Sequence, residues 1–408
     1  MSRAVAVLLV VSVSWSCAPE SSTDSNAVRE TLPNGATLIR YTALPPTDAA
    51  APSVADAYAD LKLGVLEGDP NYIFGDIRGV EATGNGTIYV LDYQASEVRT
   101  FAPDGTFMEV LASQGEGPGE IREANGIFLQ GDSLLWINDH GQMDIIGVDL
   151  AGDEVTRFPF PVRSYGYIWD PVWDDRGRLW RATSHSDEER QWPPETGLVE
   201  RNYRGYFKWY DPVTEDTDSV FTGEGTGRSY VSEEGGGWSY RGVPFEGGGF
   251  TRVIPAGGMW SGNTASYRLA RTDEAGDTVL VIEADLPVDP VTDEDRAEYV
   301  RATVERDPES RRTAEAIAAL MPDVKPILRG VFVDPDGWLW VQRVTDTGAP
   351  SFYDLYTHEG DYLGSLRLIL DGTPRGPLRV RNGNVYTWFL DELDVPYVVR
   401  IPLPALTS

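Results

Sequence analysis

Short apolar segments alternate with tight turns along most of the chain. Between residues 76 and 120, four such segments are rich in β-branched and aromatic side chains, at 79–82, 87–91, 98–101 and 107–111. Asn85-Gly86 and Asp104-Gly105 separate neighbouring segments, and their backbones accept the positive φ of tight hairpin turns. The pattern predicts four consecutive antiparallel strands, a unit that buries both of its faces only by packing against further copies.

The four-strand pattern recurs five more times. The further copies span residues 124–160, 167–223, 250–283, 327–369 and 378–401. The last copy contains only three strands, and residues 60–65, directly before the first copy, supply the missing one. Because this closure leaves no strand edge open, the sequence predicts an all-β fold, a six-bladed β-propeller of four-stranded antiparallel blades. We expect one domain over residues 36–408, with 36–41 as an extra strand at the outer edge of the ring.

Three long insertions interrupt the blades. They occupy residues 184–204, 223–249 and 286–326. Each falls in the loop after the second strand of a blade or in a connection between blades, and in a propeller these loops share one face. The third contains Thr292 followed by acidic residues, which predicts a capped helical segment between the fourth and fifth blades. Loops on a rigid scaffold often carry binding functions, so we expect a functional face; neutral growth of surface loops is the alternative.

Residues 1–17 have the pattern of an export signal. Arg3 precedes an apolar stretch over 4–13 that is too short to cross a bilayer. Cys17 is the only cysteine and stands where bacterial lipoproteins carry their lipid; residues 14–16 depart from the usual lipoprotein pattern, so cleavage and secretion is the alternative. We expect residues 18–35 to form a flexible tether, and the protein to reach the cell envelope, anchored at the outer membrane, or the periplasm or medium.

The charge of the chain excludes one class of partner. With 64 acidic against 34 basic residues the formal net charge is −30, which repels the phosphate backbone of nucleic acids. An acidic surface also keeps an exported protein in solution. We expect a monomer that meets a membrane only through a lipid anchor.

The candidate chemistry consists of isolated side chains rather than a catalytic motif. The histidines, His140, His185 and His358, form no H-x-x-H pattern, and no G-x-S-x-G sequence is present, so zinc and serine-hydrolase chemistry lack their usual signatures. Oxygen ligands recur where the second strand of a blade ends, at Asp92, Asp139, Asn263, Asp346 and Asp391. Such oxygens suit Ca²⁺, and capping of tight turns is the alternative explanation.

Large aromatic side chains lie in or beside the insertions. They are Trp192, Trp238, Tyr240, Phe245 and Trp260. Aromatic side chains of this kind can contact a glycan or a peptide. The candidate ligand-binding set therefore combines aromatic, acidic, imidazole and amide groups: Asp92, Asp139, His185, Trp192, Trp238, Tyr240, Asn263 and Asp346.

Two motifs resemble those of a known family. The runs G-E-G-P-G-E at 115–120 and D-P-D-G-W-L-W-V at 334–341 are similar to sequences of bacterial six-bladed β-propeller lipoproteins, relatives of the NHL-repeat propellers. The resemblance covers residues 66 to about 341 and implies the fold, whereas a fold alone assigns no activity. The architecture is also similar to that of the gluconolactonase-like hydrolases, which hold one Ca²⁺ near the propeller axis. That resemblance implies a candidate metal site at Asp92, Asp139 and Asn263.

Two functions follow from these patterns. The preferred one is an exported, non-catalytic binding protein, without a cofactor, that recognises a protein, peptide or glycan through its insertion face. The alternative is a Ca²⁺-dependent hydrolase or lyase with its site at the axial mouth.

Overall fold

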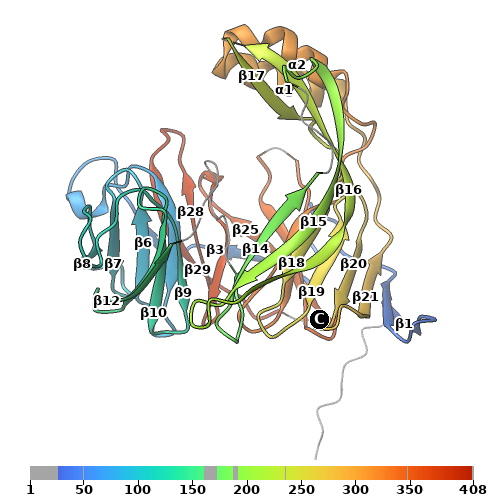
Figure 1. Ribbon diagram of the computed structural model, residues 1–408. Coiled ribbons are helices and arrows are strands. Elements are labelled where there is room, and N and C mark those ends of the chain that lie inside the picture. Colours follow the sequence, from blue (N-terminus) through green and yellow to red (C-terminus); the bar gives the residue numbers. More distant parts are fainter. Residues whose placement is uncertain are drawn as a thin grey trace, which may run out of the picture.

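Six β-sheets surround a common axis and form a six-bladed β-propeller, as the sequence predicted (Figure 1). The computed structural model describes residues 26–48, 50–159, 172–186, 192–234, 236–346 and 348–406. Cys17 and the beginning of the expected third blade at 167–171 lie outside these residues.

The first two blades each have four antiparallel strands, named here from the axis outward. Blade 1 contains β5 (Ile77–Ala82), β6 (Ile88–Asp92), β7 (Glu97–Phe101) and β8 (Phe107–Ala112). Blade 2 contains β9 (Ala124–Gln130), β10 (Leu134–Asp139), β11 (Asp144–Asp149) and β12 (Glu154–Pro159). A short 3-10 helix, η1 (Pro70–Tyr72), precedes blade 1.

The next two blades are larger than predicted. Blade 3 contains β13 (Val172–Trp173), β14 (Leu179–His185), β15 (Gly197–Tyr210), β16 (Thr217–Glu234) and β17 (Gly237–Gly242). Blade 4 contains β18 (Gly249–Val253), β19 (Met259–Asn263), β20 (Arg268–Thr272) and β21 (Thr278–Ala284), extended outward by β2 (Thr37–Tyr41) and β1 (Ala27–Thr31). The helical insertion follows as α1 (Asp293–Arg306), η2 (Pro308–Ser310) and α2 (Arg311–Ala318).

The last two blades recruit strands from the N-terminal part of the chain. Blade 5 contains β22 (Leu328–Val333), β23 (Leu339–Arg343), β24 (Ser351–Tyr356), β25 (Tyr362–Ile369) and β3 (Val54–Tyr58). Blade 6 contains β26 (Thr373–Pro374) and β27 (Arg379–Arg381) on the inside, then β28 (Asn384–Leu390), β29 (Pro396–Pro402) and β4 (Leu61–Leu63). The predicted closure is confirmed, because β4 pairs with β29 in antiparallel register.

The N-terminal segment covers the outer edges of three successive blades. β2 pairs in parallel with β21, β3 in parallel with β25, and β4 antiparallel with β29. The extra strand expected at 36–41 is therefore present as β2. The flexible tether expected over 18–35 is wrong for Ala27–Thr31, because the Asn34-Gly35 turn folds this stretch back on β2 as a hairpin.

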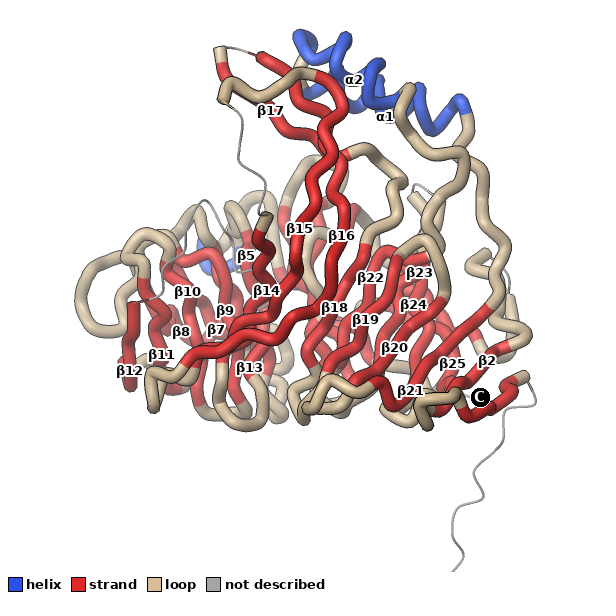
Figure 2. Tube along the Cα trace, turned by 45° about the vertical axis from the view of Figure 1, so that its right-hand side comes forward, coloured by secondary structure: helices blue, strands red, loops and turns tan. Residues whose placement is uncertain are grey.

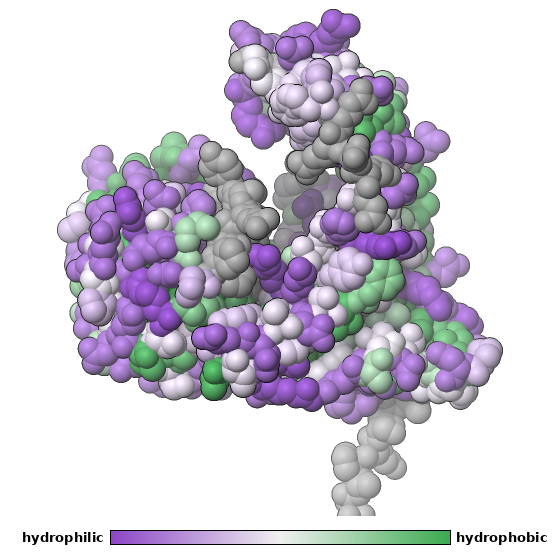
Figure 3. Space-filling view, in the orientation of Figure 1, coloured by the Kyte–Doolittle hydropathy of each residue, from purple (hydrophilic) through white to green (hydrophobic). Residues whose placement is uncertain are grey.

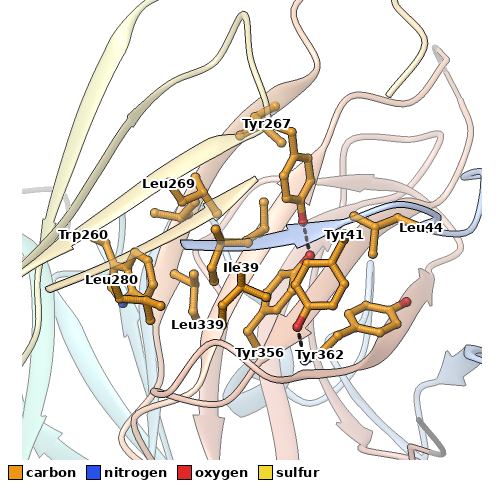
Figure 4. Packing of buried hydrophobic residues seen from close by; sticks show 14 residues of the cluster. Ile39, Tyr41, Leu44, Trp260, Tyr267, Leu269, Leu280, Leu339, Tyr356 and Tyr362 are labelled. Atoms are coloured by element: carbon orange, nitrogen blue, oxygen red, sulfur yellow. Dashed lines mark hydrogen bonds between the residues drawn. The ribbon is translucent and has the colours of Figure 1, made fainter. Parts of the chain in front are cut away.

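Hydrophobic clusters fill the contacts between neighbouring blades. In the one between blades 4 and 5, Ile39 of β2 packs with Trp260 and Leu339, and all three are buried (Figure 4). Between blades 2 and 3, the Trp136 and Trp173 rings stack with centroids 4.3 Å apart. Similar clusters join the other four pairs of neighbouring blades, so the core of the molecule is a ring of interfaces rather than a single centre.

Candidate functional site: the overhang and the axial channel

Two of the predicted insertions are strands and not loops. Residues 197–204 of β15 pair with 224–231 of β16, and β17 adds a third strand. These described parts of the segments expected as loops at 184–204 and 223–249 therefore form one β-ribbon. The register shifts between Gly205 and Tyr206, where the ribbon leaves the blade, and Gly223 opposite has φ +132°, which glycine adopts readily. The local sequence did not reveal this pairing, because the two halves of the ribbon are separated in the chain by the part of β15 and β16 that belongs to the blade and by the turn between them.

The helical insertion packs on the end of this ribbon. Val243 of the segment after β17 contacts Val291, Ala318 and Met321 in a small buried cluster. The predicted cap is present: the Thr292 hydroxyl accepts from Asp295 N–H at 3.1 Å, and the Asp295 carboxylate accepts from Thr292 N–H at 2.8 Å. We call the ribbon and the helices together the overhang.

The overhang stands on one face of the ring. Figures 1 and 2 show β15, β16 and β17 rising from blade 3, with α1 and α2 carried above the same face. The one-sided placement of the insertions expected from the sequence is therefore observed. Figure 3 shows the molecule hollowed between the ring and the overhang.

The overhang carries exposed aromatic side chains. Trp192 is 74% exposed, and its ring meets that of Trp238 edge to face with centroids 6.3 Å apart. Tyr240 is 47% exposed and holds the Arg201 guanidinium 5.7 Å from its ring centroid. The structure thus brings together Trp192 and Trp238, which are far apart in the sequence. Two other aromatic candidates serve packing instead: Trp260 is buried between blades, and Phe245 packs against the helical cluster.

Asp92 and Asp139 occupy equivalent places in blades 1 and 2, and both are fully buried. Asp92 accepts four backbone N–H bonds at 2.9 to 3.3 Å, from Gly75, Asp76, Gln94 and Ala95. Asp139 accepts four at 2.7 to 3.3 Å, from Arg122, Glu123, Gly141 and Gln142. Each carboxylate therefore ties the end of its strand to the connection that enters the blade, which agrees with turn capping rather than with metal binding.

The other candidates do not gather around these two carboxylates. Asn263 is exposed and accepts from Ala265 N–H at 2.9 Å, and His185 is exposed at the end of β14. Asp391 caps its own turn, accepting from Leu393 and Val395 N–H at 2.9 Å each. Among the residues that the structure describes, no three His, Cys, Asp or Glu side chains are placed to share a metal ion.

The remaining histidines lie apart from one another. His358 is exposed in a turn of blade 5, with Nδ1 3.0 Å from the Glu359 carboxylate. The Nδ1 atom of His140 is buried in blade 2 and has no hydrogen-bond partner among the described residues.

A cavity of about 1320 Å³ lies inside the ring, and we call it the axial channel. The innermost strands of all six blades line it, and Asp346 is the one residue of the candidate ligand-binding set that does so. Five arginines also line it: Arg252, Arg329, Arg375, Arg379 and Arg381. None of these arginines was predicted from the sequence, although a repeated motif marks the position of one, Arg329: I-R-G-V at 77–80, A-N-G-I at 124–127 and L-R-G-V at 328–331.

Each copy of this motif places a β-bulge in an innermost strand. In blade 5, Leu328 pairs with Arg343 and Gly330 with Gln342, so that Arg329 is the extra residue. Arg78 and Asn125 hold the same position in blades 1 and 2. A bulge re-aims the side chain of the extra residue, and in blade 5 that residue lines the channel.

Comparisons with known proteins agree with the fold. Residues 53–189 match the model of a protein family described as a 6-bladed beta-propeller. A search of curated proteins finds no match. Among the described residues, no helix has the length and apolar character needed to span a membrane.

Several solved structures match this chain at low sequence identity. A member of the DUF4221 family from Bacteroides vulgatus is 10% identical, with a TM-score of 0.47 over 85% of this chain and 98% of that one. A catalytically inactive virginiamycin B lyase from Staphylococcus aureus is 11% identical, with a TM-score of 0.39 over 84% of this chain and 99% of that one. A calcium-binding regucalcin from Agrobacterium tumefaciens is 10% identical, with a TM-score of 0.31 over 86% of this chain and 99% of that one. We draw no functional conclusion from these three; the six sheets and the family match together make this chain a six-bladed β-propeller.

Proposed function

We propose that this chain is an exported, non-catalytic binding protein of the cell envelope that holds a glycan against the overhang. The observation that carries the proposal is the aromatic group at the overhang, formed by the exposed Trp192 and Tyr240 and the half-buried Trp238. Exposed aromatic clusters on a rigid support are uncommon on surfaces that bind nothing, and flat rings offer large contact areas at low entropic cost.

The support beneath these rings is rigid. The ribbon continues the strands of blade 3 beyond one register shift, and the helical cluster packs on its far end. Arg228 of β16 forms ion pairs with Glu200 of β15 at 3.1 Å and with Glu246 beyond β17. A preorganised surface loses less conformational entropy when its ligand binds.

The alternative function, a Ca²⁺-dependent hydrolase or lyase at the axial mouth, lacks comparable support. It needs several side chains that share one metal ion, and no such group of three is present among the described residues. Asp92 and Asp139 each accept four backbone N–H bonds instead.

The proposal is tested with the purified chain on an array of oligosaccharides and short peptides. We expect saturable binding to one class of glycan that Trp238→Ala and Tyr240→Ala each weaken. Tyr58→Ala is the matched control, because Tyr58 is also exposed (60%) but lies on the outer strand of blade 5. Binding to peptides alone would replace the glycan with a peptide ligand. No binding, or binding that the overhang variants leave unchanged, would reject the proposal.

A further inference from the structure

The axial channel carries positive side chains that the proposed glycan surface does not use. We propose that its wall in blades 4 to 6 binds a small organic anion with two or more carboxylate groups, held by Arg252, Arg329 and Arg375. We call these three residues the arginine wall. The inference goes beyond the proposed function, because it concerns the channel and not the overhang.

Arg252 lies beside the bulge that carries Arg329, at the junction of blades 4 and 5. The Nη2 atom of Arg252 lies 4.0 Å from the position that a Cβ on Gly330 would occupy, and Gly330 directly follows Arg329. Arg252 Nη1 donates to the Thr251 carbonyl at 2.8 Å, which fixes one edge of the guanidinium group. The Arg252 side chain therefore reaches across to the backbone at the bulge that presents Arg329.

Arg375 enters the channel from blade 6. The inner strand of that blade is interrupted between β26 and β27, and residues 375–378 line the channel there. Arg375 N–H donates to the Trp388 carbonyl at 3.1 Å. A side chain on the neighbouring Gly376 would collide with the Trp388 ring, because its Cβ would stand 2.1 Å from two ring carbons. The interruption is therefore held tightly against the blade.

The arginine wall differs from the other arginines of the channel in its charge partners. Arg379 forms an ion pair with Glu81 at 2.7 Å, and Arg381 forms one with Asp132 at 2.7 Å. For the three residues of the wall, no carboxylate of the described part of the chain lies within 4.0 Å. Carboxylates are plentiful, since the chain has 64 acidic residues against 34 basic ones.

The lining of the cavity also contains Glu81, Asp174, Asp175, Asp334 and Asp346. Because no carboxylate pairs with the three arginines of the wall, their guanidinium groups favour an anionic occupant at this part of the cavity. Arg329 and Arg375 are exposed and Arg252 is half-buried, so an anion from solution can reach all three guanidinium groups. The planar fork of arginine matches a carboxylate with two parallel hydrogen bonds. Residues from three blades point to a ligand with more than one acidic group. Apolar residues of the same wall, including Val331 and Phe332, would contact its carbon chain.

The test is calorimetric titration of the purified chain with succinate at constant ionic strength. We expect saturable binding with a Kd in the millimolar range or tighter, weakened at least about tenfold by the double substitution Arg252→Gln/Arg329→Gln. The matched control is Arg311→Gln/Arg312→Gln, which removes the same charge from exposed positions on α2. Its Kd should equal that of the wild type.

Two results would overturn the inference. One is the absence of saturable succinate binding to wild-type chain whose circular dichroism shows a folded protein. The other is an equal Kd in the wild type and in a folded Arg252→Gln/Arg329→Gln variant. Trp238→Ala separates the two proposals, because it should impair glycan binding and leave the succinate Kd unchanged.

Discussion

Trp340 donates its indole N–H to the carboxylate of Asp334 at 2.8 Å, across the first turn of blade 5. The same contact joins Trp180 to Asp174 in blade 3, also at 2.8 Å. In both blades the carboxylate accepts a second bond, at 2.9 Å, from the backbone N–H four residues further along. The two turns therefore repeat one hydrogen-bond arrangement.

Neighbouring side chains separate the two turns electrostatically. Arg178 Nε donates to Asp174 at 2.7 Å, whereas blade 5 has Trp338 at the equivalent position. Burial raises the pKa of Asp334 to about 6, against the opposing effect of its hydrogen bonds. Burial acts in the same direction on Asp174, but the hydrogen bonds from Trp180 and Arg178 outweigh it and hold the pKa of that carboxyl below its usual value.

Asp334→Asn should therefore change the stability of the protein in a pH-dependent way. A carboxyl whose pKa is higher in the folded state binds protons more tightly there, so the wild type loses stability as the pH rises from about 4 to about 6. Asparagine has no such dependence. The difference in unfolding free energy between the variant and the wild type should therefore shift in favour of the variant by about 2–3 kcal/mol as the pH rises from 4 to 7. Urea denaturation of both proteins at a series of pH values measures this difference.

Asp174→Asn is the control with the opposite sign. The pKa of Asp174 is lowered in the folded state, so its carboxylate contributes stability above the unfolded pKa, and this is lost as the pH falls through the folded pKa. This variant should be less stable than the wild type at neutral pH, with a constant difference between pH 6 and pH 8. If both variants differed from the wild type in unfolding free energy with the same sign and the same pH profile, the opposite pKa shifts assigned to Asp334 and Asp174 would be wrong.

Leu63→Ala should destabilise the ring at its closure. Leu63 lies in β4, is 3% exposed, and packs in the cluster between blades 6 and 1. Removing a buried leucine side chain costs about 2–5 kcal/mol of unfolding free energy. Leu66→Ala, at a position that is 58% exposed, should change it by less than about 0.5 kcal/mol. Equal effects in denaturant unfolding would mean that β4 does not close the ring.

Tyr41→Phe should loosen the N-terminal strand on blades 4 and 5. The Tyr41 hydroxyl donates to the Gly360 carbonyl at 2.7 Å and accepts from Tyr362 N–H at 2.8 Å, and its ring lies among buried side chains (Figure 4). Without the hydroxyl, two buried backbone groups lose a partner, so we expect a loss of about 1–3 kcal/mol. Tyr58→Phe, at an exposed position, is the control. The measurement is the rate of proteolysis of the N-terminal strand. An equal rate in Tyr41→Phe and in the control would show that the hydroxyl does not hold this strand in place.

Gly79 and Gly330 hold the same position of the repeated bulge motif but should respond differently to alanine. A Cβ on Gly79 would lie 2.6 Å from Ile127 Cγ1, across the interface between blades 1 and 2. A Cβ on Gly330 would meet only the end of the Arg252 side chain, at 4.0 Å. Gly79→Ala should cost about 1–3 kcal/mol, whereas Gly330→Ala should cost less than about 1 kcal/mol. Thermal unfolding of each variant measures its loss of stability. Equal losses in the two variants would show that the bulge itself requires glycine.

The amino-acid sequence by itself determined the blades and their closure. Each blade is a series of hairpins whose turns, such as Asn85-Gly86 and Asp104-Gly105, set the register within a few residues. The closing strand at 60–65 was also readable, because the last repeat lacked one strand. The capped helix at Thr292 was also predictable from the sequence, because the capping residue and the acidic residues of the first turn are close neighbours in the chain.

Only the tertiary structure decided which side chains meet between blades and above the ring. The parallel pairing of β2 with β21 joins residues more than 200 positions apart, and no local periodicity encodes it. The ribbon depends on two strands that continue beyond their blade, and the arginine wall depends on the packing of blades 4 to 6 around one cavity. Hairpin geometry is a property of neighbouring residues, whereas a shared cavity is a property of the closed ring.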